Sequence, residues 1–275
     1  MSHRKHGHRF RLYFLSAFVG VSICAHVQAA SFDHGIWDRL LRAHVTLIAE
    51  GHASRVDYRG MAADRDRLTA YLSSLSSVTR VTFDAWPKHE QLAFLINAYN
   101  AFTVELILTK YPGLRSIKEL GWFLQTPWQK RFIPLLGETV SLDDIEHGMI
   151  RRSGRYDEPR IHFALNCASV GCPALRDAAY TGTRLDTQLD DAARSFLSDR
   201  SRNRLTGGVL EVSSIFKWYR EDFERGWGGF HSLRQFFAAY AQALDFGPGD
   251  LQKLRDGSLP IEFLSYDWRL NDVRR

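Results

Sequence analysis

One stretch of the chain has almost no polar face. Between Glu90 and Thr109, apolar residues occupy positions 92–96, 98, 99, 101, 102, 104 and 106–108. A helix that is apolar on every side packs in the interior of a protein. The sequence Tyr111-Pro112-Gly113 then ends this helix, because proline cannot continue it. The rest of the chain must therefore fold around one central, buried helix.

The other predicted segments are shorter and of mixed type. Apolar residues recur at helical spacing in 33–50 and 61–75, which predicts two amphipathic helices. We also expect helices at 141–151, 183–199, 214–224, 230–244 and 249–256, hairpins at 131–140 and 204–212, and strands at 160–166 and 260–266. Few, scattered strands among many helices predict an α+β fold, with a small, mainly antiparallel sheet packed by many helices.

The N-terminus has the parts of a secretory signal peptide. Basic residues at 4, 5, 9 and 11 precede an apolar run over 12–25, and Val27-Gln28-Ala29 offers a small-residue cleavage site. The run is too short to span a membrane. Cys24 follows Ile23, a side chain too large for a lipoprotein signal. We therefore expect cleavage of residues 1–29, no stable membrane anchor, and one exported domain at 30–275, either periplasmic or extracellular.

The charge balance argues against nucleic acid as a partner. The chain has 36 Lys+Arg and 31 Asp+Glu, and the predicted signal peptide holds four of the basic residues and no acidic one. The exported chain is then close to neutral, and it contains no basic run interleaved with aromatic residues. A small molecule or a peptide is the expected partner. The sequence indicates no cofactor and does not predict an oligomeric state.

The segment 162–173, HFALNCASVGCP, brings a histidine and two cysteines together in the sequence. On the predicted strand, His162 and Asn166 share one face. Cys167 follows at the predicted start of a helical turn, where a helix N-terminus lowers the pKa of a thiol. Extended chain would nevertheless separate His162 from Cys167 by about 16 Å, which is too far for a hydrogen bond between them.

His147 is therefore a second candidate base. It lies in the predicted helix 141–151, at the margin of an apolar stripe that contains Glu146. A carboxylate on a buried face needs a partner, so Glu146 belongs either to a functional site or to a core ion pair with an arginine. Asn97 and Asn100 in the apolar helix raise the same question, since buried amides must be satisfied. They either orient a substrate or cap loop backbone.

Cys167 and Cys172 are the only cysteines left after the predicted cleavage. In an oxidising compartment they can form a disulfide, or one of them can act as a nucleophile. A zinc site built from His162 and both cysteines is a third interpretation. Neither CxxC spacing nor the His-x-Glu signature of the zinc deaminases is present, so we expect no metal.

Several blocks together resemble the domain-of-unknown-function family 547. They are 93–100 (AFLINAYN), 142–147 (LDDIEH), 162–169 (HFALNCAS) with 171–173 (GCP), 215–219 (IFKWY) with Asp222 and Phe223, and 266–271 (YDWRLN). The family pattern highlights Asn97, Asn100, Glu146, His147, His162, Cys167, Cys172 and Asp267. Leu95 departs from it, where many relatives have tryptophan. The resemblance implies a papain-like relation among thiol hydrolases, with glutathione or a γ-glutamyl peptide as one substrate class.

We therefore expect an exported cysteine-dependent hydrolase of a small amide or peptide. Cys167 attacks, His147 or His162 acts as the base, and Glu146 or Asp267 orients that base. The expected substrate contacts are Asn97, Asn100, Asn166 and Cys172. The alternative is a non-enzymatic binding module of the cell envelope in which Cys167 and Cys172 form a disulfide.

Overall fold

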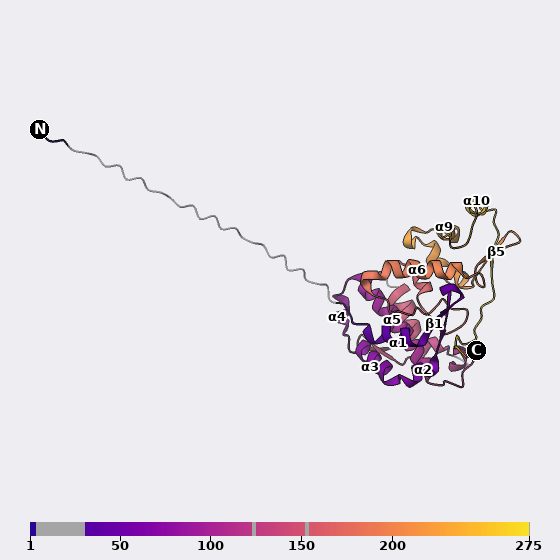
Figure 1. The fold of residues 1–275 in the computed structure, drawn as a ribbon, viewed down its shortest axis with the longest axis horizontal. Coiled ribbons are helices and arrows are strands. Elements are labelled where there is room, and N and C mark those ends of the chain that lie inside the picture. The colour runs from indigo at the N-terminus through magenta and orange to yellow at the C-terminus, as the bar shows by residue number, and fades with distance from the viewer. Residues whose placement is uncertain (4–30, 123–124, 152–153, 275) are drawn as a thin grey trace.

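The computed structural model describes residues 1–3, 31–122, 125–151 and 154–274. The predicted signal peptide falls almost wholly outside the described residues. Helices dominate the described part, and its strands form two hairpins and one three-stranded sheet (Figure 1). The predicted α+β class is confirmed. That residues 30–275 form a single domain stays a prediction.

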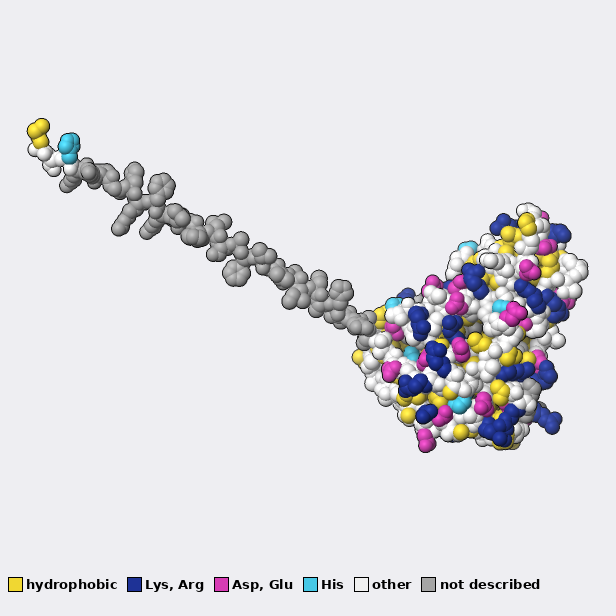
Figure 2. Space-filling view, in the orientation of Figure 1, with side chains coloured by type: hydrophobic (Ala, Val, Ile, Leu, Met, Phe, Trp, Pro, Cys, Tyr) yellow, Lys and Arg dark blue, Asp and Glu magenta, His cyan; other side chains and the backbone are white. Residues whose placement is uncertain are grey.

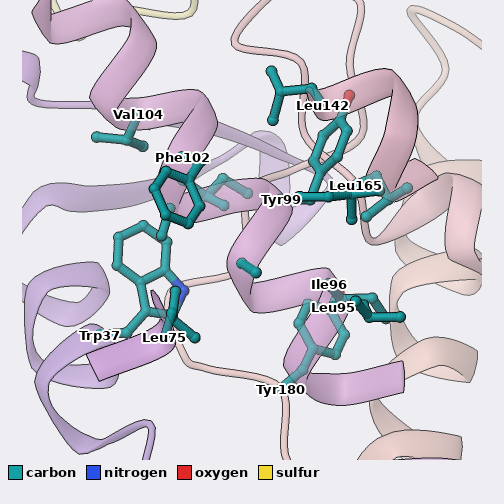
Figure 3. Packing of buried hydrophobic residues seen from close by; sticks show 14 of the residues in the cluster. Trp37, Leu75, Leu95, Ile96, Tyr99, Phe102, Val104, Leu142, Leu165 and Tyr180 are labelled. Atoms are coloured by element: carbon teal, nitrogen blue, oxygen red, sulfur yellow. The ribbon is translucent and has the colours of Figure 1, made fainter. Parts of the chain in front are cut away.

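Helix α5, Lys88–Leu108, is the buried helix that the sequence predicts. It is long and apolar enough to cross a membrane, yet nearly all of this stretch is buried inside the protein. Figure 3 shows Leu95, Tyr99 and Phe102 of α5 packed in one cluster with Trp37 and Leu142 from other segments. Because α5 has no polar face, neighbouring elements cover it on every side.

Six α-helices and strands of the described chain precede α5, and α2 and α3 among them contact it. The six are α1 (Gly35–His44), β1 (Val45–Ile48), β2 (Ala53–Val56), α2 (Tyr58–Ala63), α3 (Arg65–Ser76) and α4 (Arg80–Asp84). The predicted helix 33–50 is too long, because its second half is β1, which pairs antiparallel with β2. Val45, Thr46 and Ile48 are β-branched and favour a strand. The predicted helix 61–75 is divided between α2 and α3.

The next elements agree with the predicted hairpin and helix. Strands β3 (Ile133–Leu135) and β4 (Glu138–Val140) pair antiparallel across Leu136 and Gly137, both with positive φ. The predicted helix 141–151 forms as a π-helix, Asp144–Arg151. Ser141 and Asp144 cap its start reciprocally, each accepting a hydrogen bond from the other's backbone N–H. π-helical turns are rare and frequently lie at functional sites.

The predicted strand 160–166 is wrong. Residues Pro159–Phe163 form a short 3₁₀ helix, η5, and the following residues are irregular. Proline suits the first position of a helix, and the Glu158 side chain caps it by accepting from the Arg160 N–H. His162 and Cys167 are therefore not held apart by extended chain.

The C-terminal part follows the predicted order of elements. It contains α6 (Leu185–Ser198), β5 (Arg204–Thr206), β6 (Val209–Val212), α7 (Ile215–Trp218), α8 (Arg220–Glu224), α9 (Leu233–Ala239), α10 (Pro248–Asp256) and β7 (Ile261–Phe263). Strand β6 pairs antiparallel with β5 and parallel with β7. The pairing in the described sheets is thus mainly antiparallel, as predicted.

Two apolar clusters meet at η5 and α6. The first surrounds α5 and includes Ile161 and Leu189, whereas the second includes Phe163 and Phe196 together with side chains of α7–α10. In Figure 1, α6 lies between the part that holds α5 and the part that holds α9 and α10. η5 and α6 therefore each contribute to both clusters.

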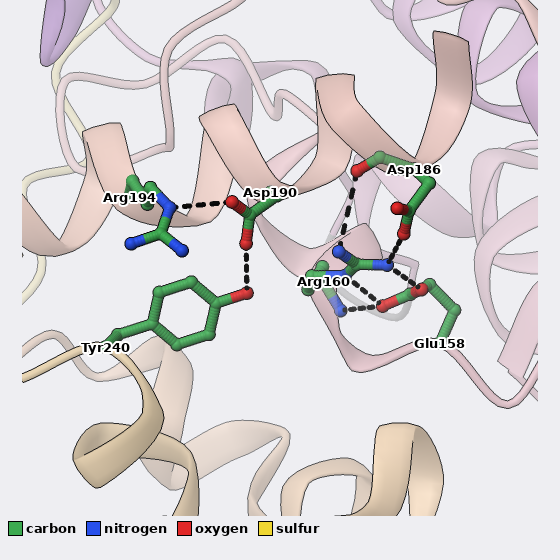
Figure 4. Close-up of polar contacts among 6 residues, drawn as sticks. All are labelled: Glu158, Arg160, Asp186, Asp190, Arg194 and Tyr240. Carbon is green, nitrogen blue, oxygen red and sulfur yellow. Dashed lines mark hydrogen bonds and ion pairs between the residues drawn. The ribbon is translucent and has the colours of Figure 1, made fainter.

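Polar contacts also fix this junction. Arg160 of η5 donates to Asp186 at the start of α6 (2.7 Å), and Asp190 of α6 accepts from the Tyr240 hydroxyl at 2.9 Å (Figure 4). On the face shown in Figure 2, acidic and basic side chains are interspersed rather than gathered into one patch.

Candidate functional site

A cavity of about 280 Å³ lies where the two clusters meet. Its walls come from α5, the π-helix, the segment 162–173, the region of α7, and the C-terminal segment around Tyr266. Five predicted site residues line it: Glu146, His147, His162, Cys167 and Cys172. The other four predicted site residues are not among the described residues that line it: Asn97, Asn100, Asn166 and Asp267.

The buried amides of α5 hold backbone rather than face the cavity. Asn97 donates to the Tyr180 carbonyl at 2.8 Å and accepts from the Tyr180 N–H at 3.0 Å. Asn100 donates to the Ala164 carbonyl at 2.9 Å and accepts from the Asn166 N–H at 2.8 Å. Loop capping, one of the two interpretations of these amides, is the role their contacts describe. Asn100 thereby fixes the chain just before Cys167.

A tight turn presents Cys167. Asn166 donates to the Pro173 carbonyl at 2.8 Å and accepts from the Ala168 N–H at 2.9 Å. Ala168 has a φ of 61°, which is uncommon for a residue with a Cβ and is found at functional sites. The expected helix start at Cys167 is wrong, because the turn continues without a helix. The predicted lowering of the thiol pKa by a helix that begins at Cys167 therefore does not apply.

Asp267 lies elsewhere. Its carboxylate pairs with Arg269, and its side chain lines a different cavity, beside Arg202. Its backbone carbonyl accepts from the Gly171 N–H at 2.8 Å. The structure therefore does not place Asp267 where it could orient His147 or His162.

Cys167 and Cys172 form a disulfide, with their Cα atoms 6.0 Å apart. Cys167 is half-buried and Cys172 is buried. The Tyr266 hydroxyl lies 3.2 Å from each sulfur, and the Ser169 hydroxyl lies 3.1 Å from Sγ of Cys167. The Cys167 N–H donates to Sγ of Cys172 at 2.9 Å. Donors of this kind stabilise a thiolate once such a bond is opened.

Gly171 allows Tyr266 to reach the sulfurs. A Cβ at Gly171 would lie 3.0 Å from three carbons of the Tyr266 ring. Backbone hydrogen bonds from Val170 to Arg269 and from Gly171 to Asp267, both 2.8 Å, hold the C-terminal segment beside the cysteine segment. Burial raises the pKa of Tyr266 above its ordinary range, so its hydroxyl keeps its proton.

A buried histidine–carboxylate pair also belongs to the site. Nε2 of His162 lies 2.7 Å from Oδ2 of Asp222, and both side chains are buried. Arg151 and Arg225 also bind the Asp222 carboxylate. Burial alone would raise the pKa of Asp222, but hydrogen bonds from His162 and Arg151 lower it to about 2. Asp222 is therefore ionised at neutral pH.

The state of His162 follows from this pair. Burial lowers the pKa of His162, although the Asp222 carboxylate opposes the shift, so its imidazole is neutral at neutral pH. With Nε2–H donating to Asp222, Nδ1 remains as an acceptor. The Tyr219 ring stacks on the imidazole with the ring centroids 3.9 Å apart. The orientation of His162 is thus fixed from two sides.

His147 is engaged at both ring nitrogens. Arg151 donates to Nδ1 at 2.7 Å, which places the ring proton on Nε2, 3.7 Å from the Asp143 carboxylate. Because Arg151 occupies Nδ1 of His147, that nitrogen is not available to take a proton from a nucleophile. The buried Glu146 carboxylate contributes to the raised pKa of Tyr99 and of Tyr219, and it also interacts electrostatically with Arg151, so both interpretations of Glu146 stay open.

No role was predicted for Asp222, Tyr219 or the tryptophans of the cavity. Asp222 and Tyr219 stand in blocks that carry the family resemblance, which was the available signal. Their proximity to His162, some 60 positions away, depends on the tertiary fold. Within the described residues, no group of three or more His, Cys, Asp or Glu side chains could hold a metal ion.

The fold and the site define an α+β protein with a buried His–Asp pair and a disulfide in one cavity. Residues 83–197 match the family described as "Protein of unknown function, DUF547". The resemblance to this family is confirmed over residues 83–197. The matched segment carries His162, Cys167 and Cys172, whereas Asp222 and Tyr266 lie beyond it. No curated protein and no solved structure matched the chain.

Proposed function

We propose that this protein is a cysteine-dependent hydrolase of a small amide or peptide. The observation that carries the proposal is the buried His162–Asp222 pair, whose histidine lines the same cavity as Cys167. Burying a carboxylate costs free energy, and buried titratable pairs with shifted pKa values beside a cavity are enriched at functional sites. A nucleophile, a base and a carboxylate that orients the base form the working set of cysteine hydrolases.

The disulfide must open before Cys167 can react. A dithiol, or two molecules of a monothiol, would open the bridge by exchange: the reductant is oxidised to its own disulfide, and Cys167 and Cys172 are left as free thiols. Both cysteines line the cavity, and Cys167 is the better nucleophile of the two because it is the less buried. Tyr266 and Ser169 would then donate to its sulfur.

The reaction follows from these roles. Nδ1 of His162 takes the thiol proton of Cys167, and the thiolate attacks the carbonyl carbon of the substrate. The C–N bond breaks, the protonated His162 gives its proton to the departing amine, and a thioester remains. Water, deprotonated by His162, hydrolyses that thioester and restores the thiol. Asp222 keeps the imidazole in the required tautomer throughout.

The size of the cavity limits the substrate. A volume of about 280 Å³ accommodates a group of a few residues at most. Glutathione and other γ-glutamyl peptides therefore belong in the substrate panel together with ordinary di- and tripeptides. We also propose export, since a disulfide persists outside the reducing cytosol. The papain-like relation stays a prediction.

Turnover of such a panel tests the proposal. Reduced wild-type protein and Cys167→Ala are incubated with each peptide, and released amines are identified by mass. We expect hydrolysis of at least one peptide by the wild type and none by the variant. Equal turnover by both proteins, or no turnover of any peptide by reduced protein with a free Cys167, would contradict the proposal.

The closed disulfide also favours a second candidate function. A permanently bridged Cys167–Cys172 pair would rigidify the floor of a binding cavity, as expected for a ligand-binding module of the envelope. This candidate predicts a bridge that resists mild thiol reductants, and ligand binding that weakens when Cys167→Ala and Cys172→Ala together remove the bridge.

A further inference from the structure

We propose that the substrate of this cavity carries a positively charged ammonium group close to the bond that is cleaved. This inference rests on the proposed function, because it names the substrate class of the same cavity. It follows from the charged and aromatic side chains that line the walls.

Two carboxylates line the cavity, and no basic side chain among its described lining residues balances their charge. Asp143 and Glu146 line the cavity, and no lysine or arginine is among the described residues that do so. Arg151, the nearest basic side chain of the π-helix, is directed at Asp222 and His147. An anionic group that entered the cavity would meet two carboxylates and no lysine or arginine among the described lining residues.

Asp143 is the carboxylate with room for a new partner. Glu146 lies close enough to the Tyr99 and Tyr219 hydroxyls to raise the pKa of both, whereas the contact from Asp143 to His147 is 3.7 Å, too long for a hydrogen bond. Burial raises the pKa of Asp143, although His147 opposes the shift. An ammonium group bound at this half-buried carboxylate would supply the missing hydrogen bonds.

Aromatic rings form the facing wall. Trp218 and Trp268 lie within 4.8 and 4.5 Å of the Tyr266 ring, measured between ring centroids, and all three rings line the cavity. Cations are attracted to the faces of such rings. Lys118 already places its ammonium nitrogen 3.8 Å from the Trp268 centroid. The aromatic rings and the carboxylates are thus two independent features that both favour a positively charged ligand.

The volume of the cavity places the ammonium group near the reacting bond. Asp143 and Cys167 line one space of about 280 Å³, so a ligand that reaches both is short. A free amino-terminal residue meets this requirement, since its α-ammonium lies two bonds from its own carbonyl carbon. The substrate class is therefore an amino-terminal aminoacyl amide or a short peptide with a free amino terminus.

A series of three ligands that differ only at the amino terminus tests the inference. Alanyl-alanine amide carries a positive charge, its N-acetyl derivative is neutral, and its N-succinyl derivative is negative. Binding to the oxidised protein, in which the bridge is closed and turnover is blocked, is measured by the change in tryptophan fluorescence. We expect the free amine to bind about tenfold more tightly than the acetyl derivative, as for one charge-assisted hydrogen bond, and the succinyl derivative most weakly.

Two variants assign the effect to the cavity. Asp143→Asn should reduce the preference for the free amine to about twofold or less and leave binding of the acetyl derivative unchanged. Glu138→Gln is the matched control, because Glu138 is an exposed carboxylate on β4 that does not line the cavity. Equal binding of the three ligands, tighter binding of the succinyl derivative, or an unchanged preference in Asp143→Asn would overturn the inference. Because no turnover is needed, failure of the hydrolase proposal would leave this measurement interpretable.

Discussion

Nε2 of His162 donates to Oδ2 of Asp222 across 2.7 Å, although the two residues lie 60 positions apart in the chain. This bond determines which ring nitrogen carries the proton, and it leaves Nδ1 as the basic atom. The carboxylate is also bound by Arg151 and Arg225, so it cannot rotate freely. Asp222 is therefore the residue that positions the proposed base.

Asp222→Asn should lower kcat/KM by a factor of about 10² to 10⁴, because the amide keeps the shape of the side chain but no longer selects the tautomer of His162. Asp267→Asn is the control, since the Asp267 side chain lines a different cavity, and it should leave kcat/KM within about twofold of the wild type. Kinetics on a hydrolysed peptide, with circular dichroism to verify folding, check both. A folded Asp222→Asn protein with wild-type kinetics would exclude the proposed role.

The redox state of the cysteines should control activity. Wild-type protein with the bridge closed should be inactive, and a thiol reductant should restore activity. Cys172→Ser cannot form the bridge and keeps Cys167, so it should be active without reductant, whereas Cys167→Ser should be inactive under both conditions. Thiol counting in parallel with the rate measurement checks this. Full activity of a protein with no free thiol would contradict the account.

Asn97 and Asn100 should differ in effect although both are buried on α5. Removing either side chain leaves backbone groups unsatisfied, so Asn97→Ala and Asn100→Ala should each lower the free energy of unfolding by about 2–4 kcal/mol. Only Asn100 holds the residues that lead into Cys167. We therefore expect Asn100→Ala also to lower kcat and Asn97→Ala to leave kcat unchanged. The rates are measured well below the melting temperature of each variant, so that all of the protein is folded. The same kcat in both variants would mean that this contact does not position Cys167.

His34 should make stability depend on pH. Burial lowers the pKa of His34 to about 4, whereas the unfolded chain has the ordinary value of 6.5. The unfolded state therefore binds a proton first as the pH falls. Above pH 6.5, His34 is neutral in both states and protonation does not reduce stability. As the pH falls from 6.5 to about 4, the free energy of unfolding decreases by about 3 kcal/mol. Urea unfolding of wild type and His34→Gln across this range checks it, because the variant should lose less stability. If the free energy of unfolding changed with pH in the same way in the two proteins, His34 would not titrate as described.

The elements that could be predicted from the sequence are those with strong local signals. The all-apolar pattern identified α5, and turn residues identified the β3–β4 and β5–β6 hairpins. The segment 160–166 was predicted wrongly because its alternation of apolar residues resembles a strand, while Pro159 and the Glu158 cap favour a 3₁₀ helix. A short segment of this kind is decided by its caps and its tertiary contacts.

The candidate site could be predicted only in part for a related reason. Glu146, His147, His162 and both cysteines stand in recognisable blocks, and they do line one cavity. The position of Asp222 beside His162, and of Tyr266 beside the sulfurs, depends on how α8 and the C-terminal segment pack. Asp267 was preferred to Asp222 because sequence alone does not show which carboxylate faces inward.

The reactivity of Cys167 tests the central claim most directly. After mild reduction, the protein is treated with a small alkylating reagent at pH values from about 4 to 9, and the modified cysteine is identified by mass. We predict rapid labelling of Cys167 with an apparent pKa well below the ordinary thiol value of about 8.5, and slower labelling with an ordinary pKa in His162→Gln. Labelling of Cys167 with an ordinary pKa in the wild type, unchanged by His162→Gln, would contradict the account.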